Sequence, residues 1–170
     1  MNHVRTRLLT VALVVSLVLT GGCSAGMDSA DVPGALESSS ANLSTPEDAV
    51  LSYLSAVSRA YATGDSEVAS QTMTPEEGVR IDSYIQFNAQ QQRGIEQRLR
   101  SFTVGTLSEE STQAVLTASE EWTYRYFVPE TGEYSGPELS ASYETTYTLV
   151  RVDRGWVVAV VEASSRGEVK

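Results

Sequence analysis

The stretch Ala114–Tyr126, AVLTASEEWTYRY, decides the fold class of this chain. Apolar or aromatic side chains alternate there with mostly polar ones, and a period of two is typical of a half-buried β-strand. One face of this strand carries Ala114, Leu116, Ala118, Trp122, Tyr124 and Tyr126. The stretch therefore predicts a long antiparallel strand with one face on a core and the other toward solvent.

The segment that follows repeats the pattern. After a loop rich in Gly and Pro, a second alternating stretch would place on its inner face Leu139, Ala141, Tyr143, Tyr147 and Leu149. Asp153–Arg154–Gly155 then predicts a hairpin turn. Residues 156–163 are apolar on both faces, which indicates a central strand or a strand covered by a partner.

The segment before the strand predicts two helices. Residues 45–48, Thr-Pro-Glu-Asp, combine an N-cap, a first-turn proline and acidic residues, and Gly64 fits the C-terminal stop. Thr74 predicts the start of the second helix, with Glu77 placed for a capping box. This helix is expected to end near residues 93–94.

A strand is predicted between the second helix and Ala114. It covers residues 95–107, and its alternation slips near Arg100–Ser101, as it does at a β-bulge. Helices followed by a meander of long strands predict an α+β domain, in which N-terminal helices pack on a curved antiparallel sheet.

Three motifs carry a resemblance to a known family: Glu121-Trp122-x-Tyr124-x-Tyr126, Tyr143-x₃-Tyr147-x-Leu149-x-Arg151 and Gly155-Trp156-x-Val158. With the opening helix, they make residues 45–163 similar to the nuclear transport factor 2-like (cystatin-like) superfamily, and within it to the IMS-type domain of bacterial envelope proteins. The resemblance implies a cone-shaped domain. The superfamily includes isomerases, dehydratases, polyketide cyclases and binding modules, whereas the IMS-type group is generally non-catalytic, so the resemblance implies protein–protein contact.

Glu120 is the leading candidate for a functional side chain, because alternation places its carboxylate on the apolar face. A buried carboxylate there could act as a general base, or it could accept a hydrogen bond from a tyrosine or arginine, or lie at the open mouth of the cone. The other candidate pocket residues are Trp122, Tyr124, Tyr143, Tyr147 and Arg151. The alternative is that these aromatic residues are core and that Arg151 pairs with an acid on the sheet.

Composition excludes several kinds of chemistry. The only histidine is His3, the only cysteine is Cys23, and the only lysine is Lys170. The chain beyond Cys23 therefore offers no His-based triad, no cysteine nucleophile, no His/Cys zinc site and no disulfide. The acidic pairs at residues 109–110 and 120–121 lack calcium-loop spacing, and we expect neither a metal nor a cofactor.

Charge narrows the class of partner. All 22 acidic residues follow Cys23, against nine arginines and one lysine, so this part carries a net charge near −12 before its termini are counted. Such acidity disfavours nucleic acid and electrostatic docking on anionic lipid. We expect a protein partner, or a homodimer formed through the sheet.

The N-terminus predicts export and a lipid anchor. Arg5 and Arg7 precede an uncharged run, and Gly21–Gly22 then stands against Cys23. The run is shorter than the roughly 20 residues of a spanning helix and fits a secretory signal. Small residues before a cysteine resemble the bacterial lipobox, which implies cleavage between Gly22 and Cys23 and fatty acyl chains such as palmitate on Cys23. The alternatives are an ordinary signal peptide cleaved nearby and a short uncleaved anchor.

The predicted organisation has four parts: a signal peptide at 1–22, a lipidated Cys23 with a flexible tether to residue 44, the α+β domain at 45–163 and a polar tail at 164–170. We expect an extracytoplasmic lipoprotein held at the cell membrane, with inner and outer membrane both open. It would act as a non-enzymatic binding or scaffold module of the cell envelope. The alternative is a small-molecule binder, or a weak lyase or isomerase that uses Glu120.

Overall fold

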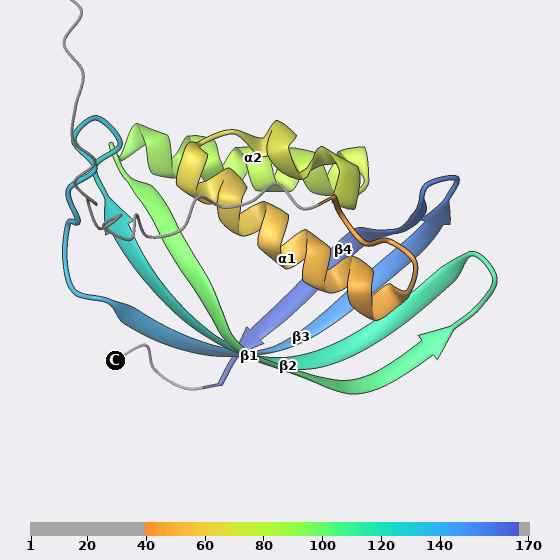
Figure 1. Ribbon diagram of the computed structural model, residues 1–170. Coiled ribbons are helices and arrows are strands. Elements are labelled where there is room, and N and C mark those ends of the chain that lie inside the picture. The colour runs from red at the N-terminus through yellow and green to blue at the C-terminus, as the bar shows by residue number, and fades with distance from the viewer. Residues whose placement is uncertain (1–39, 167–170) are drawn as a thin grey trace, which may run out of the picture. The chain divides into compact units, whose positions relative to one another are not determined.

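The structure is a computed structural model and describes residues 40–166. The predicted signal peptide, Cys23 and most of the predicted tether lie outside these residues. The described part contains α1 (Pro46–Thr63), a 3-10 helix η1 (Ser66–Thr72), α2 (Pro75–Gln90), β1 (Gly94–Glu109), β2 (Gln113–Phe127), β3 (Leu139–Val152) and β4 (Gly155–Ser165). Helices come first and an antiparallel sheet follows, so the predicted α+β class is confirmed (Figure 1).

Local signals place both ends of α1. The Thr45 hydroxyl accepts a hydrogen bond from the backbone N–H of Asp48 at 3.2 Å, and Pro46 occupies the first turn. Gly64 ends the helix with φ of 71°, a left-handed conformation that favours glycine, and its N–H donates to the Ala60 carbonyl at 2.8 Å. The buried face of α1 includes Val50, Tyr53, Leu54, Val57 and Ala60.

The second helix begins as predicted and ends earlier. Thr74 caps α2 by accepting from the Glu77 N–H at 3.4 Å. The helix stops at Gln90, and the backbone N–H of Arg93 turns back to the Asn88 carbonyl at 3.2 Å. The Glu77 side chain does not complete a capping box, because it points into the domain instead.

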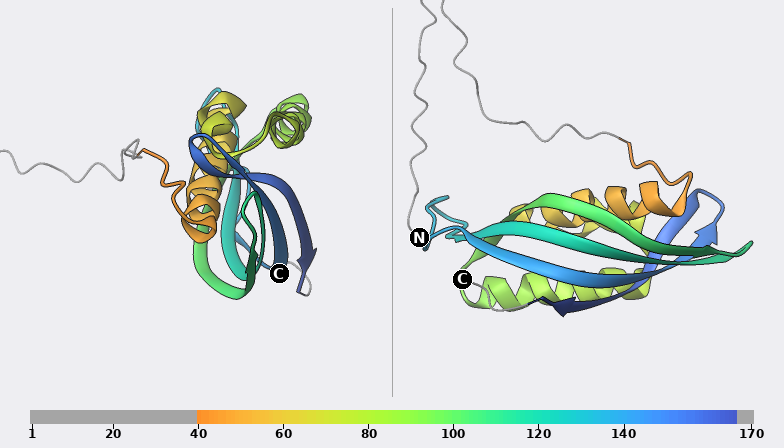
Figure 2. Two further views of the ribbon diagram at one scale, coloured as in Figure 1. Left: turned by 90° about the vertical axis from the view of Figure 1, so that its right-hand side faces the viewer. Right: turned by 90° about the horizontal axis from the view of Figure 1, so that it is seen from below.

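The four strands form one sheet in the order β1-β2-β3-β4, with every neighbouring pair antiparallel. The register between β1 and β2 shifts between Leu99 and Ser101, so the predicted bulge at Arg100 is confirmed. A second shift lies between Val104 and Leu107. The sheet curves beneath the helices, and α1 lies against its concave side while α2 stands farther out (Figures 1 and 2).

Of the two alternatives predicted for residues 156–163, the central strand is wrong, because β4 is an edge of the sheet, and cover by a partner stays a prediction. Its first part is covered by the chain itself. Met73 pairs with Val158 as a parallel bridge, and the Thr74 N–H donates to the Val158 carbonyl at 2.9 Å. Beyond this cover, Val160 remains 48% exposed.

The packed domain is slightly wider than residues 45–163. Leu43 is buried, and its carbonyl accepts the Trp156 N–H at 2.9 Å. Gly155 allows this approach, because a Cβ at that position would lie 2.3 Å from the Leu43 carbonyl oxygen. At the other end, β4 continues to Ser165. Leu43 therefore ties the chain before α1 to the β3–β4 hairpin.

Candidate functional site

Glu120 lies on the concave face of β2 and is only 4% exposed. One carboxylate oxygen, Oε2, accepts a hydrogen bond from the indole Nε1–H of Trp122 at 2.7 Å. The other, Oε1, accepts from the hydroxyl of Tyr147. Both oxygens of this buried carboxylate are therefore engaged by donors from the surrounding aromatic residues.

The strand register explains this grouping. Glu120 and Trp122 are two residues apart on one strand, so their side chains share a face. In the β2–β3 ladder Glu120 is opposite Tyr143, and Leu116 is opposite Tyr147. The long Tyr147 side chain reaches along the sheet to Glu120. Burial raises the pKa of the Tyr147 hydroxyl, and the adjacent Glu120 carboxylate raises it further.

A second buried carboxylate faces the same interior from α2. Glu77 is 3% exposed, and its Oε1 accepts a hydrogen bond from the Tyr53 hydroxyl of α1 at 2.5 Å. The Arg80 guanidinium donates from Nε to Glu77 Oε2 at 2.8 Å and from Nη2 to Oε1. Burial raises the pKa of Tyr53, followed by the effect of Glu77. The hydrogen bond to Glu77 raises the pKa of Arg80.

Sequence reasoning missed this second group, because Glu77 was explained locally as a capping residue. The signal that could have found it is helical spacing. Glu77, Ile81 and Ile85 recur every four residues and form one face of α2, and all three are buried. A carboxylate that continues an apolar stripe needs a partner in the interior.

The two carboxylate groups meet through an aromatic pair. The rings of Tyr53 and Tyr147 lie 6.4 Å apart at an angle of 74°, an edge-to-face contact. The Tyr53 hydroxyl points to Glu77 and the Tyr147 hydroxyl to Glu120. This arrangement fills the space between α1, α2 and the sheet, and it holds two charges in fixed positions by hydrogen bonds.

The remaining candidate pocket residues do not join this network. Tyr124 and Tyr143 are half-buried on the same sheet face. The ring of Tyr124 makes an edge contact with Tyr126 at 5.8 Å. Arg151 is exposed, and its guanidinium lies 5.5 Å from the centre of the Trp156 ring. Among the predicted residues, the structure thus brings together Glu120, Trp122 and Tyr147.

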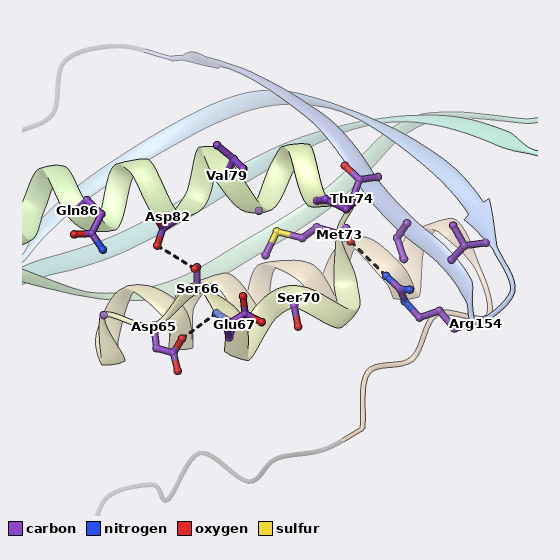
Figure 3. Close-up of a pocket in the computed structure, with 15 residues that line it drawn as sticks. Asp65, Ser66, Glu67, Ser70, Met73, Thr74, Val79, Asp82, Gln86 and Arg154 are labelled. Carbon is purple, nitrogen blue, oxygen red and sulfur yellow. Dashed lines mark hydrogen bonds between the residues drawn. The ribbon is translucent and has the colours of Figure 1, made fainter.

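Hollows lie elsewhere on the domain. A groove of about 870 Å³ runs between η1, α2 and the β3–β4 hairpin (Figure 3). A smaller cavity of about 190 Å³ lies between the C-terminal ends of α1 and α2 and the start of β1, with Tyr61, Arg93 and Phe127 in its wall. Glu120 lines neither of them.

No helix within residues 40–166 is both long and apolar enough to cross a membrane. The same range holds no group of three or more Asp, Glu, His or Cys side chains placed to bind a metal ion.

The N-terminal helices pack on the concave side of a curved antiparallel sheet that follows them in the chain. This arrangement defines a nuclear transport factor 2-like (NTF2-like), cystatin-like domain. The chain belongs to the family described as the TcaA protein NTF2-like domain, which matches residues 44–162. No curated protein sequence matches the chain.

Solved structures share this fold at low sequence identity. The intermembrane space region of the chloroplast protein ARC6 is 16% identical, covers 71% of this chain and 94% of its own, and superposes with a TM-score of 0.59. A putative calcium/calmodulin dependent protein kinase II association domain from Xanthomonas campestris is 17% identical, with coverages of 74% and 91% and a TM-score of 0.49. A periplasmic fragment of TraM is 13% identical, with coverages of 71% and 98% and a TM-score of 0.47.

Proposed function

We propose that this protein is a lipid-anchored lipoprotein on the extracytoplasmic face of a bacterial membrane, and that its NTF2-like domain is a non-enzymatic protein-binding or scaffold module. The observation that carries the non-enzymatic part is the state of Glu120. A general base must lie within hydrogen-bond reach of a substrate proton, so it must be accessible to the substrate. Glu120 is 4% exposed, and each of its oxygens already accepts a hydrogen bond from Trp122 or Tyr147.

The position of the network supports the same proposal. Tyr53, Tyr147 and the two carboxylates occupy the concave side of the sheet, where an NTF2-like enzyme would hold a substrate. The alternative, a lyase or isomerase that uses Glu120, would require these aromatic residues to move away. Binding therefore falls to the outer surfaces of the domain.

Two observations support the envelope location: the N-terminal sequence and the location of a solved structure with the same fold. Gly21–Gly22 before Cys23 supports lipid attachment. The ARC6 region, whose fold this domain shares, is an intermembrane space region. Kinship with the IMS-type group is part of this proposal.

The anchor is tested by labelling cells with a fatty acid analogue. The wild-type protein should carry the label and sediment with membranes. Cys23→Ala should lose the label and either leave the membrane fraction or accumulate as the precursor. An unlabelled wild-type protein would refute the anchor, and the same cells without the gene are the control.

The binding role is tested by photo-crosslinking in intact cells. A photoreactive amino acid is placed in turn at exposed positions on each side of the domain, such as Ser70, Glu109 and Val160. A specific protein should crosslink from at least one side and be unaffected by Glu120→Gln. The absence of any crosslinked protein from all sides would refute a scaffold role.

A further inference from the structure

The groove between η1, α2 and the β3–β4 hairpin has an apolar wall and base. Met73 and Val157 are buried at its base, while Val79 projects from α2 and is 66% exposed. An exposed valine beside a hollow of about 870 Å³ offers an apolar contact that the domain itself does not use. Neither Glu120 nor Glu77 lines the groove.

Charge is distributed unevenly along the groove. Asp65, Glu67 and Asp82 lie at one end, and Arg154 lies at the other (Figure 3). The three acids take part in no ion pair within residues 40–166. Asp82 of α2 accepts a hydrogen bond from the Ser66 hydroxyl of η1 at 3.1 Å. This bond joins the two helices that carry the acidic residues of the groove.

The other end is fixed and positive. The Arg154 guanidinium donates from Nε to the Gln71 carbonyl at 3.0 Å and from Nη2 to the Met73 carbonyl at 3.4 Å. The N-terminus of α2, at Thr74 and Pro75, lies beside it and adds the positive end of a helix dipole. The groove is therefore negative at one end, apolar in the middle and positive at the other.

We propose that this groove is the docking surface for an extended segment of a partner protein. The segment places a lysine or arginine among Asp65, Glu67 and Asp82 and an apolar side chain against Val79. Charge complementarity selects this occupant, because Asp65, Glu67 and Asp82 form no ion pair within residues 40–166 and together attract a cation. The negative net charge of the chain also steers cationic partners toward the protein. This inference rests on the proposed protein-binding role and identifies where that role is carried out.

The test uses the full-length protein in nanodiscs of phosphatidylcholine, a neutral lipid that does not attract a cationic peptide. The probe is a fluorescent, end-capped peptide that alternates arginine and leucine, and its affinity is measured by anisotropy at low salt. The groove variant combines Glu67→Gln with Val79→Ser. Its affinity should fall by about fivefold or more, since one charge contact and one apolar contact are lost.

The matched control combines Glu109→Gln with Val68→Ser. It makes the same chemical changes at exposed positions that do not line the groove, and Val68 is 41% exposed. Its affinity should change less than about twofold. Circular dichroism checks that both variants remain folded. Equal losses in the two variants, or equal binding of a peptide that alternates glutamate and leucine, would overturn the proposal.

Crosslinking separates this inference from the proposed function. A protein crosslinked from Ser70, and lost in the Glu67→Gln, Val79→Ser variant, supports the groove. Crosslinks from Val160 or Glu109 alone would overturn the groove and leave the protein-binding role standing. No crosslink from any side would overturn both.

Discussion

Tyr147→Phe tests whether the buried Glu120 network stabilises the fold. The substitution keeps the ring, and with it the edge contact to Tyr53, and removes the hydroxyl that donates to Glu120 Oε1. Tyr147 is 1% exposed and Glu120 is 4% exposed, so little water can replace the lost donor. The remaining donor, the Trp122 indole, serves the other oxygen at 2.7 Å. The substitution therefore lowers the free energy of unfolding, because it leaves Glu120 Oε1 buried without a hydrogen-bond donor.

Loss of a hydrogen bond to a buried charged group costs about 2–3 kcal/mol. For a domain of this size, the melting temperature should fall by roughly 6–15 °C. Urea unfolding followed by tryptophan fluorescence is a suitable assay, because Trp122 and Trp156 are both buried, at 8% and 1% exposure.

Tyr143→Phe is the matched control. Tyr143 is the ladder neighbour of Glu120, but its hydroxyl makes no side-chain hydrogen bond within residues 40–166. Its removal should cost less than about 0.5 kcal/mol. A double-mutant cycle with Glu120→Leu should show coupling of about 2 kcal/mol between Tyr147 and Glu120. Equal effects of the two tyrosine changes, or strict additivity in the cycle, would refute the reasoning.

Four further changes have defined outcomes. Trp156→Ala should cost about 3–5 kcal/mol, because it opens a cavity in the core; a urea midpoint close to wild type would contradict the packing. Removal of all residues before position 45 deletes Leu43 and its hydrogen bond, and should cost about 2–4 kcal/mol. A chain that begins at position 41 should have the same melting temperature as the full-length protein. Equal melting temperatures of the two truncated chains would disprove the stabilising contact of Leu43. Glu120→Gln should change stability by less than about 1 kcal/mol, because an amide can accept from the indole and donate to the phenol; an activity that this change alone abolishes would overturn the non-enzymatic proposal. Burial raises the pKa of Tyr53 and Tyr61, so stability should be complete below about pH 10 and fall as pH rises above it; tyrosinate absorbance that appears before circular dichroism changes would show that these hydroxyls ionise in the folded state.

The long strands could be predicted because their burial is one-sided. In β2, Ala114, Leu116 and Ala118 are buried while Val115 is exposed, so alternation in the sequence mirrors alternation in space. The helix starts were equally accessible, since Thr45 and Thr74 act as caps through their own hydroxyls. Strand alternation and helix caps depend only on residues close together in the sequence, so the sequence is enough to predict them.

The place of β4 in the sheet could not be predicted in the same way. An apolar stretch resembles a central strand wherever both faces are covered. Here part of the free edge of β4 is paired at Val158 by Met73 and Thr74, which lie on the connection between η1 and α2, far back in the chain. That contact depends on the path of the backbone, and no residue in or near β4 predicts it.

The candidate site shows the same division. Glu120 could be singled out because a carboxylate interrupts an apolar strand face. Glu77 was missed despite its spacing with Ile81 and Ile85, because its position in the first turn of α2 has a sufficient local explanation. Its partner Tyr53 is on another helix, and only the packing of α1 against α2 brings the two together.

The bond between the Leu43 carbonyl and the Trp156 N–H has a consequence for the order of folding. It joins the residues just before the first helix to the last strand, so it can form only when nearly the whole chain is available. The helices that are synthesised first bury their apolar faces on strands that are synthesised later, and such long-range contacts delay folding. A chain that passes through a membrane from its N-terminus would therefore remain open until β4 has emerged. If the chain is exported as proposed, the domain closes only on the far side of the membrane.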